Sequence, residues 1–335
     1  LLMIGGVATG LAVRPLSALR EFTVSYLGLV IVPYVALFVR SRRDISRVFI
    51  GVALVGVGAP LVLLPLVGEL KGWGIGPETR FYPSTVHMGI VYGLLCLYLL
   101  WARGRAWRLV FAVVLIPSVF LIVVDSHRSV WLAISVSLVV LTVTGRIRLE
   151  RFWKWGFVVV LVAVLAGTAL AALGRDPIGY VASRSVAFSD PNADATSAWR
   201  LALWEGAIRQ GRQHLVLGEG FGSYYGFRTS LGTITVSPHS LYVQTFLKVG
   251  LSGLLTYVAL TAVVIAALAS AWRRARRPGD RQMEPVLLMG LAAAWASVAY
   301  SLVYSFEVYS MLFVGIGLAA ALRAADRSAA SRAAR

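Results

Sequence analysis

The stretch "SPHSLYVQTFLKVGLSGLL", residues 237–255, places a proline and a histidine directly before an apolar run that continues almost unbroken to Trp272. A helix needs roughly 20 apolar residues to cross about 30 Å of hydrocarbon, and this run is long enough. The rest of the chain has the same character, because 58% of the 335 residues are hydrophobic, only 14% are charged and the mean hydropathy is +0.77. A soluble domain of this length is far more polar. The sequence therefore predicts an integral membrane protein.

Apolar blocks recur along the chain and are separated by short loops rich in arginine. Their lengths are typical of membrane-spanning helices. The predicted fold class is all-α: a polytopic membrane helix bundle of about ten spans with a mainly helical extracytoplasmic cap. The chain opens at Leu1 inside an apolar block, so we expect further spans before it in the full protein. The predicted spans cover residues 1–13, 21–39, 48–69, 87–101, 109–125, 129–145, 155–173, 240–272, 285–303 and 308–322.

The distribution of Lys and Arg predicts the orientation, because basic residues are retained on the cytoplasmic side. Of the 32 basic residues, 20 lie in segments 40–47, 103–108, 146–154, 273–281 and 323–335. All five segments fall on one side when the spans alternate, and that side is the cytoplasm. The net charge of +17 is mostly this topology signal. A nucleic-acid partner is not expected, because these loops are short, dispersed and without a recognisable binding module.

One connection between spans is much longer than the others and is expected to fold as a cap. Within it, "SAWRLALWEGAIRQ" (197–210) predicts a helix with Ser197 as N-cap. One face of that helix is expected to carry Leu201, Trp204, Ala207 and Ile208. The predicted organisation is an N-terminal transmembrane bundle at 1–173, the cap at 174–238, C-terminal transmembrane helices at 239–322 and a disordered cytoplasmic tail at 323–335.

The cap also contains a glycine-rich turn, "GEGFGSYYG" (218–226), followed by tyrosines. It lacks the Lys-Ser/Thr that ends a phosphate-binding loop. Two interpretations stay open: a purely structural turn, or a place where backbone approaches a ligand beside an aromatic platform.

Basic side chains also gather on the side opposite the cytoplasmic loops. Arg128 opens an apolar helix in "DSHRSVW" (125–131), where a charge is costly unless it is partnered, and Asp125 is the nearest candidate. An isolated arginine would instead snorkel to headgroups. The outer side is expected to hold Arg80, Arg128, Arg184 and Arg200 together with His87, His127, His214 and His239. Guanidinium groups bind a diphosphate bidentately, so a polyanionic ligand is predicted.

His239 is the candidate general base, because an imidazole near neutrality takes a proton from a hydroxyl and a neighbouring arginine lowers its pKa. The alternative is a helix-start residue hydrogen-bonded to backbone. His214, after the cap helix, is interpreted as structural, and His87 and His127 as interfacial anchors or pocket lining. The single cysteine, Cys96, excludes an internal disulfide, and no His or Cys spacing indicates a metal.

The ordered segments "HRSVWLAI", "WRLALWEGAIRQGRQHLVLGEGFGSY" and "PHSLYVQTFLKVGLSGLL" resemble the O-antigen ligase and polymerase family of bacterial envelope glycosyltransferases. The resemblance covers about residues 80–255. It departs from the family pattern most at Ser240, where an Asn is usual, and also at His127, Ala198, Trp199 and Leu215. The positions that match are Arg128, Arg200, Trp204, Gly218, Gly220, Pro238 and His239.

The resemblance implies a bacterial cytoplasmic-membrane protein of about twelve spans. It implies transfer of a glycan from an undecaprenyl diphosphate donor to a hydroxyl of a glycan, lipid or protein on the outer face, without cofactor or metal and with inversion. Arg128 and Arg200 would clamp the diphosphate, and His239 would deprotonate the acceptor. Further substrate contacts are expected from Arg80, Arg184, Tyr224, Tyr225, Tyr242, Gly218 and Gly220.

Two other classes stay open. A transporter or flippase for lipid-linked sugars would also need outer arginines, but it tends to keep charges deep within spans, where this chain has almost none. Kinship with peptidoglycan polymerases would require a catalytic acid in the cap, for which Asp190 and Asp194 are the candidates.

Overall fold

The computed structural model of the protein describes residues 15–16, 42–71, 81–101, 104–125, 127–145, 164, 168, 195–223, 225–229, 232–276 and 284–304. The spans predicted at 1–13, 21–39, 155–173 and 308–322 lie outside these residues, apart from Val164 and Thr168, as does the predicted tail.

The other six predicted spans are helices whose ends lie within a few residues of the expected positions. The helices are α3 (Arg42–Ala53), the π-helix Leu54–Gly58 and α4 (Ala59–Lys71), which together form one rod, then α5 (Ser84–Leu100), α6 (Arg105–Val124), α7 (Arg128–Val143), α11 (Leu241–Ala275) and α12 (Glu284–Ser301). Of the described helices, those at Ser46–Lys71, Arg105–Val124 and Leu241–Ala275 are long and apolar enough to cross a membrane, and α5 and α7 are shorter apolar helices. The helical membrane class is confirmed, and the total of ten spans stays a prediction.

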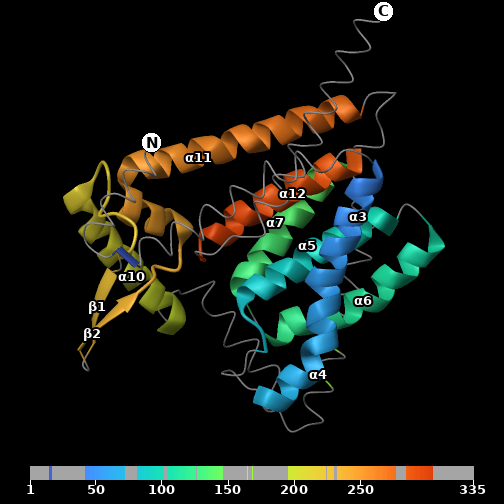
Figure 1. The fold of residues 1–335 in the computed structure, drawn as a ribbon, viewed down its shortest axis with the longest axis horizontal. Coiled ribbons are helices and arrows are strands. Elements are labelled where there is room, and N and C mark those ends of the chain that lie inside the picture. The colour runs from blue at the N-terminus through green and yellow to red at the C-terminus, as the bar shows by residue number, and fades with distance from the viewer. Residues whose placement is uncertain are drawn as a thin grey trace, which may run out of the picture.

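Small residues bring the α3–α4 rod against α5 (Figure 1). A side chain on Gly56 would collide with the carbonyl of Gly89, and one on Gly93 would collide with Val57. Gly89 and Gly93 are separated by one helical turn, which is the spacing that lets membrane helices approach closely. The π-helical segment lies at this crossing.

α12 lies at the centre of the described bundle and packs against α5, α7 and α11. Its buried surface consists largely of alanines, with Ala292, Ala293 and Ala296 fully buried. Polar residues add specific contacts, because the Tyr92 hydroxyl and the Ser297 Oγ lie 2.6 Å apart. Hydrogen bonds of this kind between helices replace those that lipid cannot provide.

α11 is broken at Gly250, whose φ of 72° and ψ of −169° are not helical. The chain after the cap helix pairs with the break: Glu219 and Gly220 donate backbone N–H bonds to Leu247 and Lys248, both at 2.9 Å, and Leu251 donates to Leu215 at 2.8 Å. The backbone groups freed by the break are therefore satisfied by the cap.

The described part of the cap contains α10 (Ala195–Gly211), a short 3₁₀ turn (Arg212–His214) and a hairpin of β1 (Tyr225–Thr229) and β2 (Gly232–Val236). Figure 1 places α10 and the hairpin beside the end of the bundle where α11 begins. The predicted helix is confirmed, but the hairpin was not predicted.

Two details of the predicted cap helix are wrong. Ser197 is not its N-cap, because α10 begins at Ala195 and Ser197 lies inside it. Leu201 points outward with 43% exposure, whereas Leu203 and Ala207 are fully buried. Ala207 is therefore buried as predicted, Trp204 and Ile208 are partly buried, and Leu203 takes the buried position that was expected for Leu201.

Candidate functional site at one end of the bundle

Side chains from four separate connections meet at one end of the bundle. The loop before α5 contacts the loop before α7, since His127 Nε2 lies 2.9 Å from the carbonyl oxygen of Tyr82. Arg128 of α7 reaches α10, and Tyr304, in the segment that follows α12, accepts a backbone hydrogen bond from Leu241 at 3.1 Å. Alternating spans would place all four connections on one side of a membrane, which agrees with the sequence-based topology.

His239 lies directly before α11 in an uncommon backbone conformation. Its φ of 52° is left-handed, which few residues other than glycine adopt. Both neighbours are tied down: the carbonyl of Pro238 accepts a 2.7 Å hydrogen bond from the indole of Trp204, and the Oγ of Ser240 caps α11 by accepting from the Val243 N–H. Ser240 thus acts as the helix cap, a role that serine fills well.

Arg200 and His239 meet at aromatic rings. The ring centroid of His239 lies 5.7 Å from that of Tyr304 and 5.7 Å from that of Trp199. The guanidinium carbon of Arg200 lies 6.0 Å from the centroid of Tyr304, in a cation–π contact. The two residues that chemistry singled out in the sequence therefore meet at one ring, although Arg200 lies on α10 and His239 lies in the segment before α11.

The surroundings of His239 keep its imidazole neutral. Its burial, and secondarily the guanidinium of Arg200, lower the pKa of His239 below the ordinary histidine value. A lowered pKa means that the ring is neutral at neutral pH and has a lone pair that can accept a proton.

Arg128 begins α7 and belongs to the same end of the bundle. Its guanidinium donates to the Oγ of Ser197 at 3.2 Å. Ser197 stands one turn before Arg200 on α10, so the contact brings the two arginines to adjacent parts of the cap helix. The prediction that Asp125 partners Arg128 is wrong, because the Asp125 carboxylate is engaged elsewhere.

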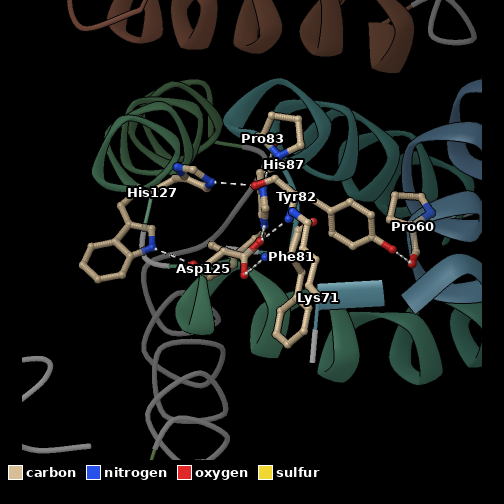
Figure 2. Close-up of polar contacts among 10 residues, drawn as sticks. Pro60, Lys71, Phe81, Tyr82, Pro83, His87, Asp125 and His127 are labelled. Atoms are coloured by element: carbon tan, nitrogen blue, oxygen red, sulfur yellow. Dashed lines mark hydrogen bonds and ion pairs between the residues drawn. The ribbon is translucent and has the colours of Figure 1, made fainter. Parts of the chain in front are cut away.

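Asp125 holds the loop before α5 (Figure 2). Its Oδ1 accepts the Phe81 N–H at 3.0 Å, and its Oδ2 accepts the Tyr82 N–H at 2.9 Å. His87 Nε2 lies 3.1 Å from Oδ2, which is ion-pair distance without good hydrogen-bond geometry. Burial alone would raise the pKa of Asp125, but the contacts from His87 and the two backbone N–H groups outweigh it and lower that pKa. His87 and His127 are buried, so neither is an interfacial anchor.

Donor atoms of His87, Asp125 and His127 lie within 4.8 Å of one another, the one such group in the described residues. Two imidazoles and a carboxylate suit Zn²⁺. The donors, however, have other partners: both Asp125 oxygens accept backbone N–H groups, and His127 Nε2 bonds the Tyr82 carbonyl. A metal would have to displace the His127 bond, so we interpret the cluster as a structural latch between the two loops.

Some of the remaining predicted substrate contacts lie within the described residues, and others lie outside them. Tyr242 donates its hydroxyl to the carbonyl of Val298 at 3.3 Å, and Tyr225 lies against Gly206 of α10. Gly218 has a φ of 69° and faces the break in α11, where a side chain would collide with the Lys248 and Gly250 backbone. That packing explains the glycine without a ligand, and the predicted ligand contacts stay predictions. The candidates Arg80, Arg184, Tyr224, Asp190 and Asp194 lie outside the described residues.

Sequence reasoning missed Trp199 and Tyr304. Tyrosines at the ends of apolar helices are typical of membrane-interface belts, so Tyr304 did not stand out. Trp199 stood directly before Arg200, and Tyr304 followed Tyr300 at helical spacing beyond a span. Only the folded chain brings both rings against His239.

These features define a multi-pass membrane protein with arginines and a neutral histidine at one end of its bundle. The family model described as O-antigen ligase matches residues 112–258, which include Arg128, Arg200 and His239. An O-antigen ligase of Pseudomonas aeruginosa is 28% identical over 136 residues, which are 41% of this chain and 33% of that protein. Over these residues the chain is similar to the O-antigen ligase family. It spans about a third of the length of the curated relative that it matches.

Proposed function

We propose that the protein is a glycosyltransferase of the bacterial cytoplasmic membrane. It takes a glycan from an undecaprenyl diphosphate donor and transfers it to a hydroxyl of a glycan, lipid or protein on the outer face. The observation that carries the proposal is the meeting of Arg200 and His239 at Tyr304, within the residues that the O-antigen ligase family model matches. A cation for a diphosphate and a neutral base then lie side by side.

The proposed reaction is a single displacement. His239 accepts the proton of the acceptor hydroxyl, whose oxygen attacks the anomeric carbon of the donor sugar. The new carbon–oxygen bond forms as the bond from that carbon to the diphosphate oxygen breaks, and undecaprenyl diphosphate leaves with the electron pair. Attack opposite the leaving group inverts the anomeric centre.

Arg200 and Arg128 bind the diphosphate and stabilise the charge that it gains on leaving. Preorganised cations perform this role without moving during the reaction, and guanidinium groups stay charged at all relevant pH values. No metal is required in this scheme, because the arginines supply the positive charge. The contact of Arg128 with Ser197 on α10 supports a joint action of the two arginines.

The test uses the full-length protein in detergent or liposomes with an undecaprenyl-diphosphate-linked glycan and candidate acceptors, and it measures release of undecaprenyl diphosphate. Arg200→Ala is expected to lower kcat/KM about 10²- to 10³-fold, as the loss of a transition-state donor does. His239→Ala is expected to lower it about 10²- to 10⁴-fold, as the loss of a general base does.

Matched controls are present in the cap. Arg209 lies on the same helix as Arg200 with 74% of its side chain exposed, and His214 is exposed. Arg209→Ala and His214→Ala should retain activity. Full activity in Arg200→Ala or His239→Ala would remove that residue from the mechanism, whereas lipid movement between leaflets without turnover of any acceptor would favour a transporter.

A further inference from the structure

Tyr304 follows the last turn of α12 and contacts both groups that the proposed mechanism uses. Its ring lies edge-on to the His239 imidazole with centroids 5.7 Å apart, and it faces the Arg200 guanidinium carbon at 6.0 Å. We propose that Tyr304 is a positioning residue of this site: its ring fixes the imidazole and the guanidinium relative to each other, so that the base acts on the acceptor hydroxyl beside the donor diphosphate that the clamp holds. This inference rests on the function proposed above.

The Tyr304 ring is well placed for this role because its own position is fixed by three elements. Its backbone carbonyl accepts the Leu241 N–H of α11 at 3.1 Å. Its ring stacks on Tyr300 of α12 with centroids 5.3 Å apart, and the Tyr300 hydroxyl lies 2.8 Å from the Ser84 Oγ of α5. The bundle core thus fixes the Tyr304 ring, and that ring contacts His239 and Arg200.

The ring, rather than the hydroxyl, makes the contacts that matter. An aromatic face attracts a guanidinium through its quadrupole, and aromatic edges and faces pack against an imidazole. Among the described residues, no hydrogen bond involves the Tyr304 hydroxyl. Phenylalanine should therefore replace Tyr304 with little effect, while leucine should not.

The test compares Tyr304→Leu with Tyr304→Phe in the full-length protein, using the lipid-linked donor and release of undecaprenyl diphosphate. Because a misplacement near 1 Å costs on the order of 10²-fold, we expect Tyr304→Leu to lower kcat about 10- to 100-fold, with KM for the donor changed much less. Tyr304→Phe should restore kcat to within about twofold of wild type, because the ring contacts are kept.

A control separates positioning from folding. Tyr98 of α5 is also partly buried and contacts an aromatic ring, Phe111, but lies outside the site. Tyr98→Leu tests what loss of a tyrosine ring does to the bundle, and we expect its kcat per folded molecule to match wild type. Wild-type kcat in Tyr304→Leu, or equal losses in Tyr304→Leu and Tyr98→Leu, would overturn the positioning role. Absence of turnover in wild-type protein with every acceptor would instead overturn the proposed function.

Discussion

The indole Nε1 of Trp204 donates a hydrogen bond to the carbonyl oxygen of Pro238 at 2.7 Å, and so joins the cap helix to the residue before His239. His239 belongs to the segment 238–241, whose other end is held by the hydrogen bond from the Leu241 N–H to the Tyr304 carbonyl. Between these anchors His239 keeps its left-handed backbone. A strained conformation of about 1–3 kcal/mol persists only where its surroundings hold it.

Trp204→Phe should weaken this arrangement while keeping an aromatic ring. The Pro238 carbonyl would lose its partner in a buried position, which costs about 1–3 kcal/mol. We expect a lower melting temperature in detergent and a kcat reduced about tenfold, because the base is less well placed. Trp295→Phe is the control, since Trp295 of α12 is 41% exposed. Equal behaviour of the two variants would contradict a special role for the Trp204 bond.

The pH dependence of kcat/KM should follow His239. Burial and the Arg200 guanidinium both lower its pKa, and the base acts only when neutral. Activity is therefore expected to rise with pH to a plateau whose acidic limb lies below about pH 6.5, the ordinary histidine value. An acidic limb above that value would contradict the assignment of His239 as base.

The same shift affects stability, with a defined sign. The unfolded chain binds the His239 proton more tightly than the folded chain does, so the stabilising contribution is complete above about pH 6.5. It is lost as the pH falls from there through the lowered pKa of the folded state. His239→Asn, which tolerates a left-handed backbone, should remove this part of the dependence of melting temperature on pH.

Hydropathy predicted six of the described helices because the signal is local: each span must be apolar along its whole length. It did not predict the break at Gly250, because a glycine in an apolar run is as consistent with close packing between unbroken helices as with a break in one helix. Arg128, Arg200 and His239 stood out because their cost in or near a membrane needed an explanation. Tyr304 did not, because a tyrosine at a span end is common there, and its contacts depend on how distant helices pack.

Asp125→Asn should destabilise the protein strongly. The buried carboxylate accepts two backbone N–H groups and contacts His87. An amide replaces one acceptor oxygen by a donor, so a buried backbone N–H or His87 Nε2 loses the oxygen that it contacts. Breaking a buried pair of this kind costs about 3–5 kcal/mol, which thermal denaturation in detergent can detect.

Glu205→Gln is the control for Asp125→Asn, because the Glu205–Arg209 pair is about three-quarters exposed, and no measurable change is expected.

Since the His87–Asp125–His127 cluster is interpreted as a latch without metal, dialysis against EDTA should leave the melting temperature of the wild type unchanged. A fall in melting temperature on chelation, with stoichiometric metal lost in Asp125→Asn, would make the cluster a metal site.

Gly250→Ala should separate the cap from α11. Gly250 has a φ of 72°, and a methyl group there would collide with the Val216 carbonyl and the Gly218 N–H. Backbone strain and the collision together should cost about 2–5 kcal/mol, measured as a lower melting temperature and less monodisperse protein. Gly51→Ala of α3 is the control, because its side chain would enter open space and alanine favours the helix by about 1 kcal/mol. If Gly250→Ala were as stable as Gly51→Ala, α11 would have to continue as an unbroken helix through this position, and the loop after α10 would not dock on it.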